Sequence, residues 1–453
     1  MEKIRICRIQ VTKLFGNISY DIDLNVDEPI AIITAPNGCG KTTLLNLISF
    51  VMSPEYDVFE KIRTIPFEAF RCVLSNGRTV ELKQVENSSG TNSKKAKKPL
   101  TYMEKAALRT KSAFDNTDFI FCIYDSNNSV MHELVYSNAL SDAFRMDPAD
   151  YLDENDEDFP FSRGQQTSPN VRLKYIWNTQ KQILDENDCR IPINYIKADR
   201  IQPVQIPDER GFDDPRPVSP LKIASENIVK YIKDATERYS EAVSRAKDKL
   251  PQMFLDGEGS GLGYEEFMDG WSVYREELDQ FQKIGLIMST EDFTKGKDIS
   301  KVYNKKGEFL STYLSAFKDT TAPLKDTFER LDLFKQILDE RNAITEKTVR
   351  FGREGISLFS RNRRISLDTL SSGEKHDFIM FYNLIFNISN NGLVLIDEPE
   401  ISLHIEWQET YLDKLIAICE MNDLQAIIAT HSPNIVSSHY DFLVDKGETY
   451  GQG

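Results

Sequence analysis

A short glycine-rich turn between an apolar run and a helix constrains this chain more than any other feature. Residues 29–34 read PIAIIT, an unbroken apolar run that is typical of a strand buried on both faces. The next segment, APNGCGKT at 35–42, has two glycines and a lysine where a helix is expected to begin, at 41–51. A buried strand, a tight turn and a helix in direct succession predict an α/β fold with a parallel sheet.

The same turn carries the residue types that a phosphate-binding site requires. Gly38 and Gly40 let successive backbone N–H groups converge on a phosphate, and the helix adds the positive end of its dipole. Lys41 can then bridge the β and γ oxygens, and the Thr42 hydroxyl can bind Mg²⁺. The predicted nucleotide-binding residues of the turn are Asn37, Gly38, Cys39, Gly40, Lys41, Thr42 and Thr43.

A second apolar run ends in two acids. Residues 393–396 read LVLI and are followed by Asp397 and Glu398. The carboxyl ends of parallel strands meet at one edge of a sheet, so both carboxylates are expected near the turn at 35–42. We therefore predict ATP and Mg²⁺ as cofactors, with Thr42 and Asp397 as metal ligands. Glu398 is predicted to be the catalytic group that polarises the attacking water.

Periodicity divides the rest of the chain into strand-rich and helical parts. Alternation of polar and apolar residues predicts strands at 4–11, 18–24, 78–82, 119–124, 348–351 and 356–359. Apolar residues at threes and fours predict helices at 228–250, 267–281, 324–337, 378–388 and 403–415, with breaks near 251–263 and 304–307. Each helix is expected to be short, which excludes a long coiled coil. A last buried strand is expected at 426–429.

Composition limits the environment and the partners. The chain has 71 acidic and 55 basic residues, a net charge of −16, which repels phosphate backbones and anionic lipid. No apolar run is long enough to cross a bilayer, and residues 1–11 read as a strand rather than a secretion signal. The six cysteines have no metal-ligand spacing, which is typical of reduced thiols in a cytoplasmic protein.

Two further segments complete a series of four motifs whose order along the chain is informative. LSSGE at 370–374 precedes a helix, and IIATHSP at 427–433 contains the last buried strand. Together with the segments at 35–42 and 393–400, this order resembles the ABC-type ATPases, and LSSGE resembles their signature motif. The resemblance implies that two heads sandwich two nucleotides. Ser371, Gly373 and Glu374 would then act on the nucleotide of the other head, and His431 would be the switch histidine that contacts the γ-phosphate.

The resemblance also suggests a branch of the superfamily and a division into domains. The stretch between Lys41 and Gly373 is several times longer than in a transporter subunit, and IDEPEISLH with ATHSPNIV resembles the OLD/RecF-like group, AAA15 or AAA21. Residues 400–404 would be the D-loop, and Gln202 or Gln205 the Q-loop glutamine. We expect an ABC-type ATPase head with an antiparallel β subdomain, made of residues 1–215 and 344–453. A helical, short coiled-coil-like insertion would occupy 216–343.

Within that group the chain resembles the standalone ATPase subunits of anti-phage defence, the AriA family of PARIS systems first and then the PtuA family of Septu systems and retrons. The resemblance implies a homo-oligomer of at least two heads that hydrolyses ATP. It would act as scaffold and sensor, and would hold and then release or activate a nuclease of the Toprim or HNH type. Only twenty residues follow Pro433, so the nuclease is expected to be a separate protein. A phage protein is the expected trigger.

Two other functions stay open. A RecF/SMC-like DNA-repair ATPase would clamp duplex DNA, and basic residues would then line its groove. The candidates are Arg350, Arg353, Arg361, Arg363 and Arg364. Separately, the lysine-rich segment at 94–98 could contact nucleic acid or a partner, or be a solvated loop. A nucleotide-locked scaffold without turnover is the third hypothesis, but Glu398 argues against it because binding alone needs no water-polarising acid.

Overall fold

The computed structural model describes residues 3–36, 38–86, 117–136, 169–196, 204–206, 216–259, 261–288, 299–342, 345–352, 355–388, 390–403, 405–445, 447 and 449–450. Its contacts divide the chain into two compact units. The sheet unit combines Met1–Ala198 with Ile388–Gly453, and the helical unit is Asp199–Asn387. The basic segment at 94–98 and the acidic segment at 147–158 lie outside the described residues.

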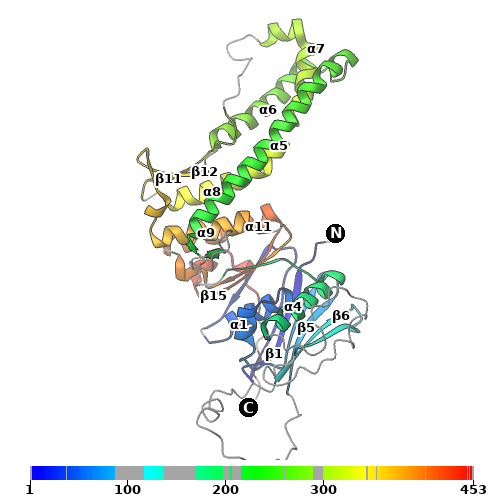
Figure 1. The fold of residues 1–453 in the computed structure, drawn as a ribbon, viewed down its shortest axis with the longest axis vertical. Coiled ribbons are helices and arrows are strands. Elements are labelled where there is room, and N and C mark those ends of the chain that lie inside the picture. Colours follow the sequence, from blue (N-terminus) through cyan, green and yellow to red (C-terminus); the bar gives the residue numbers. More distant parts are fainter. Residues whose placement is uncertain are drawn as a thin grey trace, which may run out of the picture. The chain divides into compact units, whose positions relative to one another are not determined.

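A four-stranded parallel sheet forms the centre of the sheet unit (Figure 1). Its order is β3 (Ile30–Thr34), β15 (Gln425–Thr430), β14 (Leu393–Asp397) and β8 (Ile193–Ile196). In the register, Ala429 lies between Ile33 and Asp397. The carboxyl ends of the strands therefore meet at one edge, as the sequence predicted. Helix α1 (Lys41–Met52) follows β3, and all its residues except Thr42 are buried.

A seven-stranded antiparallel sheet forms a second layer of the sheet unit. Its order is β16 (Thr449–Tyr450), β2 (Ile18–Asp23), β1 (Ile6–Leu14), β4 (Ala69–Leu74), β5 (Thr79–Glu86), β6 (Thr117–Tyr124) and β7 (Val130–Tyr136). One hydrophobic core joins residues of both sheets with α1, α2 (Tyr56–Ile62) and α4 (Pro169–Glu186). The Gln425 side chain also joins the sheets, because it accepts from Ile6 N–H at 2.9 Å and donates to Ile6 C=O at 2.8 Å.

Helices α5 (Pro220–Asp256), α6 (Tyr264–Ile284), α7 (Ile299–Phe317) and α8 (Ala322–Arg341) run side by side in the helical unit (Figure 1). Aromatic side chains from α6 and α7, among them Trp271 and Tyr313, pack into a core between them. An antiparallel sheet of β11 (Lys347–Gly352), β12 (Gly355–Ser360) and β13 (Arg363–Ile365) precedes α9 (Ser372–Phe386). Strands β9 (Val204–Ile206) and β10 (Arg216–Val218) pair separately.

The remaining elements of the sheet unit are short and follow β14 or β15 in the sequence. They are η3 (Pro399–Ser402), α10 (Ile405–Gln408), α11 (Tyr411–Asn422), α12 (Pro433–Val436) and η4 (Tyr440–Phe442). The single helix expected at 403–415 is therefore two helices. Helix η2 (Leu367–Thr369) leads into the signature segment of the helical unit.

The predicted α/β class, with parallel and antiparallel sheets and a helical insertion, is confirmed. The expectation that each inserted helix is short is wrong for α5, which has 37 residues and continues past Pro251 to end at the left-handed Gly257. At 1.5 Å per residue it is about 55 Å long. Helices α2, α4 and α7 were not predicted, and the break expected at 304–307 is a kink at Lys306 inside α7.

The compact units differ from the three predicted sequence segments. Helix α9 packs against α5 and α8, so residues 344–387 group with the helical insertion rather than with the parallel sheet. All six cysteines are free, and four of them are buried. Among the described residues, no helix combines the length and the apolar character needed to cross a membrane.

Candidate active site

The turn between β3 and α1 requires glycine at two positions. Gly38 and Gly40 have φ of 85° and 84°, in the left-handed region that other residues rarely adopt. A Cβ on Gly40 would also lie 2.7 Å from Leu14 Cδ2 and 2.9 Å from Phe15 Cε2. The predicted role of these glycines in shaping the loop thus has a steric basis. Asn37 lies outside the described residues.

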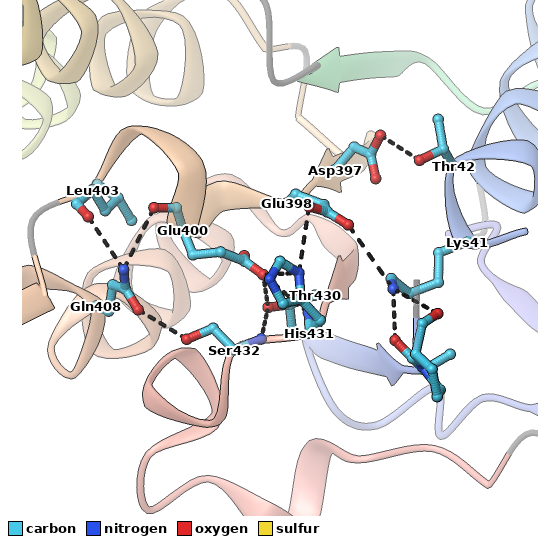
Figure 2. A network of polar contacts seen from close by, with 12 residues as sticks. Lys41, Thr42, Asp397, Glu398, Glu400, Leu403, Gln408, Thr430, His431 and Ser432 are labelled. Carbon is cyan, nitrogen blue, oxygen red and sulfur yellow. Dashed lines mark hydrogen bonds and ion pairs between the residues drawn. The ribbon is translucent and has the colours of Figure 1, made fainter. Parts of the chain in front are cut away.

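Lys41 is held over this turn. Its side chain is buried, and its Nζ donates to the carbonyl oxygens of Ala35 at 2.6 Å and Pro36 at 3.4 Å (Figure 2). It also lies 3.9 Å from Glu398 Oε1. A buried ammonium group that faces only a few oxygens is ready to exchange them for phosphate oxygens.

The two predicted metal ligands lie together although 355 positions separate them. The Thr42 hydroxyl donates to Asp397 Oδ2 at 2.9 Å (Figure 2). Two oxygens on neighbouring corners of a Mg²⁺ octahedron, each about 2.1 Å from the metal, are about 3 Å apart. A hydroxyl and a carboxylate oxygen at this separation therefore fit a magnesium ion that takes its other ligands from phosphate and water.

Glu398 is turned toward the same edge by an unusual backbone conformation. Its φ is 45° and ψ is 61°, a left-handed conformation that costs a non-glycine residue about 1–3 kcal/mol. Its N–H bonds to Ala429 C=O at 2.8 Å, which ties the end of β14 to β15. The side chain is 21% exposed, so a water molecule can reach it. Its carboxylate lies between Lys41 and His431.

His431 follows β15 and faces two carboxylates. Its Nδ1 lies 3.3 Å from Glu398 Oε2 and 2.9 Å from Glu400 Oε1 (Figure 2). The sequence analysis gave Glu398 and His431 roles at the same γ-phosphate but did not predict their contact. It named Glu400 only as the start of the predicted D-loop, although a third acid after Asp397, Glu398 and a proline was a signal.

Glu398, Glu400 and His431 also form the kind of group that can hold a cation, since one ligand atom of each lies within 4.8 Å of the others. Glu400 Oε1, however, already accepts from the Thr430 hydroxyl at 2.8 Å and from His431 N–H at 2.9 Å. We therefore interpret the cluster as a hydrogen-bond network, and Thr42 and Asp397 remain the predicted metal ligands.

The signature segment begins α9 in the helical unit. Ser371 Oγ accepts from Glu374 N–H at 3.3 Å, and Glu374 Oε2 accepts from Ser371 N–H at 2.7 Å, which is a capping box. Ser371 remains exposed at the positive end of a 15-residue helix. A Cβ on Gly373 would meet nothing within 4 Å. The action of these residues on the nucleotide of another head stays a prediction.

Glu374 is also held by Lys347, whose Nζ lies 2.7 Å and 2.8 Å from its two carboxylate oxygens. Burial alone would raise the pKa of Glu374, but the bonds from Lys347 and Ser371 outweigh it and lower that pKa. In this structure the Glu374 carboxylate thus orders the start of the signature helix.

The other candidate residues either lie outside the described residues or belong to the helical unit. Gln202 lies outside the described residues, and Gln205 belongs to β9. Of the arginines, Arg353 is outside the described residues, Arg350 stacks 4.3 Å from the Phe359 ring centroid, and Arg361 pairs with Glu346 at 2.6 Å. Arg363 and Arg364 are exposed on β13. His404, at the end of the predicted D-loop, is also outside the described residues.

Comparison with known proteins identifies one relative that is similar over part of the chain. The Retron Vc95 probable ATPase of Vibrio cholerae serotype O1 biovar El Tor is 26% identical over 185 residues, which are 38% of this chain and 33% of that protein. The matched part of the chain thus spans about a third of that relative's length. This likeness says nothing by itself about the remaining two thirds.

Two solved structures resemble the fold only distantly. The Smc head domain of Pyrococcus furiosus with an extended coiled coil, bound to the C-terminal domain of ScpA, has a TM-score of 0.36 and 12% identity, and the match covers 99% of this chain and 96% of that chain. The SmcHead bound to the C-winged helix domain of ScpA has a TM-score of 0.35 and 11% identity, with 99% and 98% covered. No inference is based on these two likenesses.

The family comparison covers almost the whole chain. The model of the AAA ATPase domain family, AAA15 type, matches residues 5–436. This range contains the turn at 35–42, the acids Asp397 and Glu398 at the end of β14, the signature segment and His431. The chain belongs to the AAA15 family of AAA ATPase domains.

Proposed function

We propose that this protein binds ATP with Mg²⁺ and hydrolyses it to ADP and phosphate. The observation that carries the proposal is the convergence of Lys41, Thr42, Asp397, Glu398 and His431 at one edge of the parallel sheet, from three distant parts of the sequence. A site for nucleotide binding alone would not need Glu398, which is partly exposed and close to the lysine.

In the proposed mechanism each residue has one task. The glycine turn and Lys41 bind the β and γ phosphates, so that Lys41 exchanges its carbonyl partners for phosphate oxygens. Thr42 and Asp397 hold Mg²⁺, which neutralises charge on the phosphates when it is bound. Glu398 orients a water molecule and accepts its proton, and His431 hydrogen-bonds the γ-phosphate on the opposite side.

Steady-state phosphate release tests this proposal. The wild-type protein should release phosphate from Mg²⁺-ATP, and Lys41→Ala should abolish both nucleotide binding and phosphate release. Normal hydrolysis by Lys41→Ala would show that the turn at 35–42 is not the nucleotide site. Glu409→Gln, an exposed carboxylate on the segment after α10, serves as a control that should hydrolyse ATP like the wild type.

We further propose that two heads close on two nucleotides. The exposed start of α9 supports this, because Ser371 and the positive end of the helix face outward and would suit a γ-phosphate held by another copy. Closure of two heads would complete each site and exclude water from it. ATP would then control the assembly as well as fuel it.

At a larger scale, we propose that the protein is the scaffold and sensor ATPase of an anti-phage defence complex. The likeness to a protein described as a retron's probable ATPase supports a defence role. The partner would be a separately encoded nuclease of the Toprim or HNH type, held by the ATP-bound heads and released or activated on infection. AriA of PARIS systems remains the favoured relative, and PtuA the next.

Co-purification tests the partner proposal. The protein would be expressed with the nuclease encoded beside it and pulled down with ATP, with ADP and without nucleotide. We expect the wild type to retain the nuclease in a nucleotide-dependent manner, and Lys41→Ala to lose that dependence. Equal recovery of the nuclease in all conditions would contradict a nucleotide-controlled scaffold.

A second candidate function is a DNA-repair ATPase that clamps duplex DNA. The observation that favours it is the exposure of Arg350, Arg361, Arg363 and Arg364 on the three-stranded sheet of the helical unit. Arg350 and Arg361 already contact other side chains of the protein, and the net charge of −16 opposes a large DNA surface. A salt-sensitive shift of duplex DNA that Arg363→Gln with Arg364→Gln removes would support this function.

A further inference from the structure

Two arginines of α8 attach the signature helix α9 to its neighbour in the helical unit (Figure 1). Near the end of α9, Arg330 Nη1 donates to Ile385 C=O at 2.5 Å. Near its start, Arg341 Nη1 lies 3.6 Å from Asp377 Oδ2, which is an ion pair without a hydrogen bond. The two ends of α9 are therefore attached in different ways, and the looser attachment is on the side of the signature segment.

The Arg341–Asp377 pair is buried. The two side chains are 7% and 2% exposed, and neither carboxylate oxygen of Asp377 has a hydrogen-bond partner among the described residues. The guanidinium carbon also lies 5.0 Å from the centroid of the Phe381 ring. Burial raises the pKa of Asp377 to about 6, the charge of Arg341 opposes this rise, and the charge of Glu374 adds to it. The ion pair thus does not offset the cost of burying its own carboxylate.

A buried ion pair of this kind adds little stability but can fix geometry. Two apolar side chains of similar volume are often as stable or more stable in such a place, because they need no desolvation. Arg341 is the last residue of α8 and Asp377 lies in the second turn of α9, so their attraction draws the two helix ends together. Phe381 lies one turn further along α9, so Arg341 contacts two successive turns of the helix that begins after Ser371.

We propose that Arg341 and Asp377 are positioning residues that hold the signature segment for ATP hydrolysis at a cost in stability. This role rests on the proposed function, in which the signature segment acts on the nucleotide of another head. Without the pair, α9 should stay packed on α8 through apolar contacts such as that of Phe334 with Phe378, but its first turns could shift. A displacement of about 1 Å can lower a rate about a hundredfold. Nucleotide binding at the Lys41 turn should be unaffected.

Melting curves and steady-state phosphate release of matched variants separate position from stability. Arg341→Met leaves the Asp377 carboxylate buried without its cation and should lower the melting temperature at pH 7.5. Addition of Asp377→Leu removes that charge, so the double variant should melt at or above the wild-type temperature. Its kcat should still be at least about tenfold below that of the wild type, with the KM for ATP within about threefold. Arg341→Lys, which keeps the charge, should retain part of kcat.

Asp269→Asn, which changes an exposed acid on α6, is the control and should behave like the wild type in both assays. A double variant with the kcat of this control would overturn the proposal, because the pair would then have no effect on the signature segment. A double variant that melts below the wild type, or that fails to fold, would also overturn it, because the pair would then be needed for stability.

The pH dependence of stability gives a readout that uses no nucleotide. The pKa of Asp377 is about 6 in the folded protein, against an ordinary value of 3.8. The ionised carboxylate therefore destabilises the fold fully above pH 6, and this cost disappears as pH falls toward 3.8. The melting temperature of the wild type should rise relative to that of Asp377→Asn between pH 7.5 and pH 4.5. Arg341, Glu374 and Lys347, which pairs with Glu374, are the same in both proteins. A constant difference would overturn the claim that the buried charge costs stability.

The two proposals fail in distinguishable ways. If ATP is not hydrolysed at the Lys41 turn, the wild type and Lys41→Ala release phosphate alike, while the melting results for the pair are unchanged. If only the positioning role is wrong, Lys41→Ala is inactive and the double variant is as active as Asp269→Asn.

Discussion

At the residue scale, the site depends on backbone conformations that few residues adopt. Gly38, Gly40 and Glu398 all have positive φ. The glycines shape the turn after β3, and the left-handed Glu398 has its carboxylate between Lys41 and His431. One strained non-glycine position, Glu398, thus lies where the chemistry is proposed.

The loss of ATP affinity caused by each glycine-to-alanine substitution should follow the backbone angle and the space at that glycine. Gly40→Ala combines a φ of 84° with a Cβ 2.7 Å from Leu14 Cδ2, so the turn must distort. We expect at least about a tenfold loss in ATP affinity, since a left-handed residue costs about 1–2 kcal/mol. Gly38→Ala, strained but without a close neighbour, should lose less. Gly352→Ala has neither problem and serves as the control in the same fluorescent-nucleotide titration.

Replacement of Glu398 by Gln should separate binding from chemistry. The amide keeps the shape of the side chain but cannot accept a proton from water, so phosphate release should fall at least about a hundredfold. ATP affinity should be retained, because Lys41, Thr42 and Asp397 are unchanged. Single-turnover hydrolysis and equilibrium binding measure the two effects. A variant that hydrolyses ATP at the wild-type rate would rule out Glu398 as the base.

At the scale of elements, the sequence correctly predicted those helices and strands that local sequence patterns determine. Strand β3, the turn and α1 were correct because an apolar run, two glycines and a helix start are all local signals. The predicted length of α5 is too short because Pro251 indicates a break in the sequence. In the structure the helix continues past this proline. The contact between Glu400 and His431 follows the left-handed turn at Glu398, which sequence spacing does not reveal.

The pH dependence of stability tests the ion pair between Glu374, at the start of α9, and Lys347. The pKa of Glu374 is lowered in the folded protein, so its ion pair with Lys347 stabilises the fold above the ordinary carboxyl pKa of about 4.5 and is lost as pH falls through the lowered value. Lys347→Met should therefore reduce the melting temperature at pH 7, and the difference from the wild type should shrink toward pH 4. Lys375→Met, which removes the same charge from α9, the helix that carries Glu374, is the control. A difference independent of pH would contradict the ion-pair explanation.

At the scale of the whole molecule, the sheet unit contains the turn and the proposed metal ligands and base, and the helical unit contains the predicted signature segment. Our proposal assigns the signature segment of each chain to the nucleotide of the other. A protein built this way has incomplete sites as a monomer and complete sites as a dimer. Hydrolysis should therefore rise faster than linearly with protein concentration below the dissociation constant of the dimer.

A mixed-subunit assay tests that arrangement most directly. Lys41→Ala and Ser371→Arg subunits, each inactive alone and each with a wild-type melting curve, are mixed in equal amounts. If the site is shared, each mixed dimer contains one site with an intact turn and an intact signature segment, and roughly a quarter of the wild-type activity should return. Activity that stays at the level of the separate variants would contradict the closure of two heads on shared nucleotides.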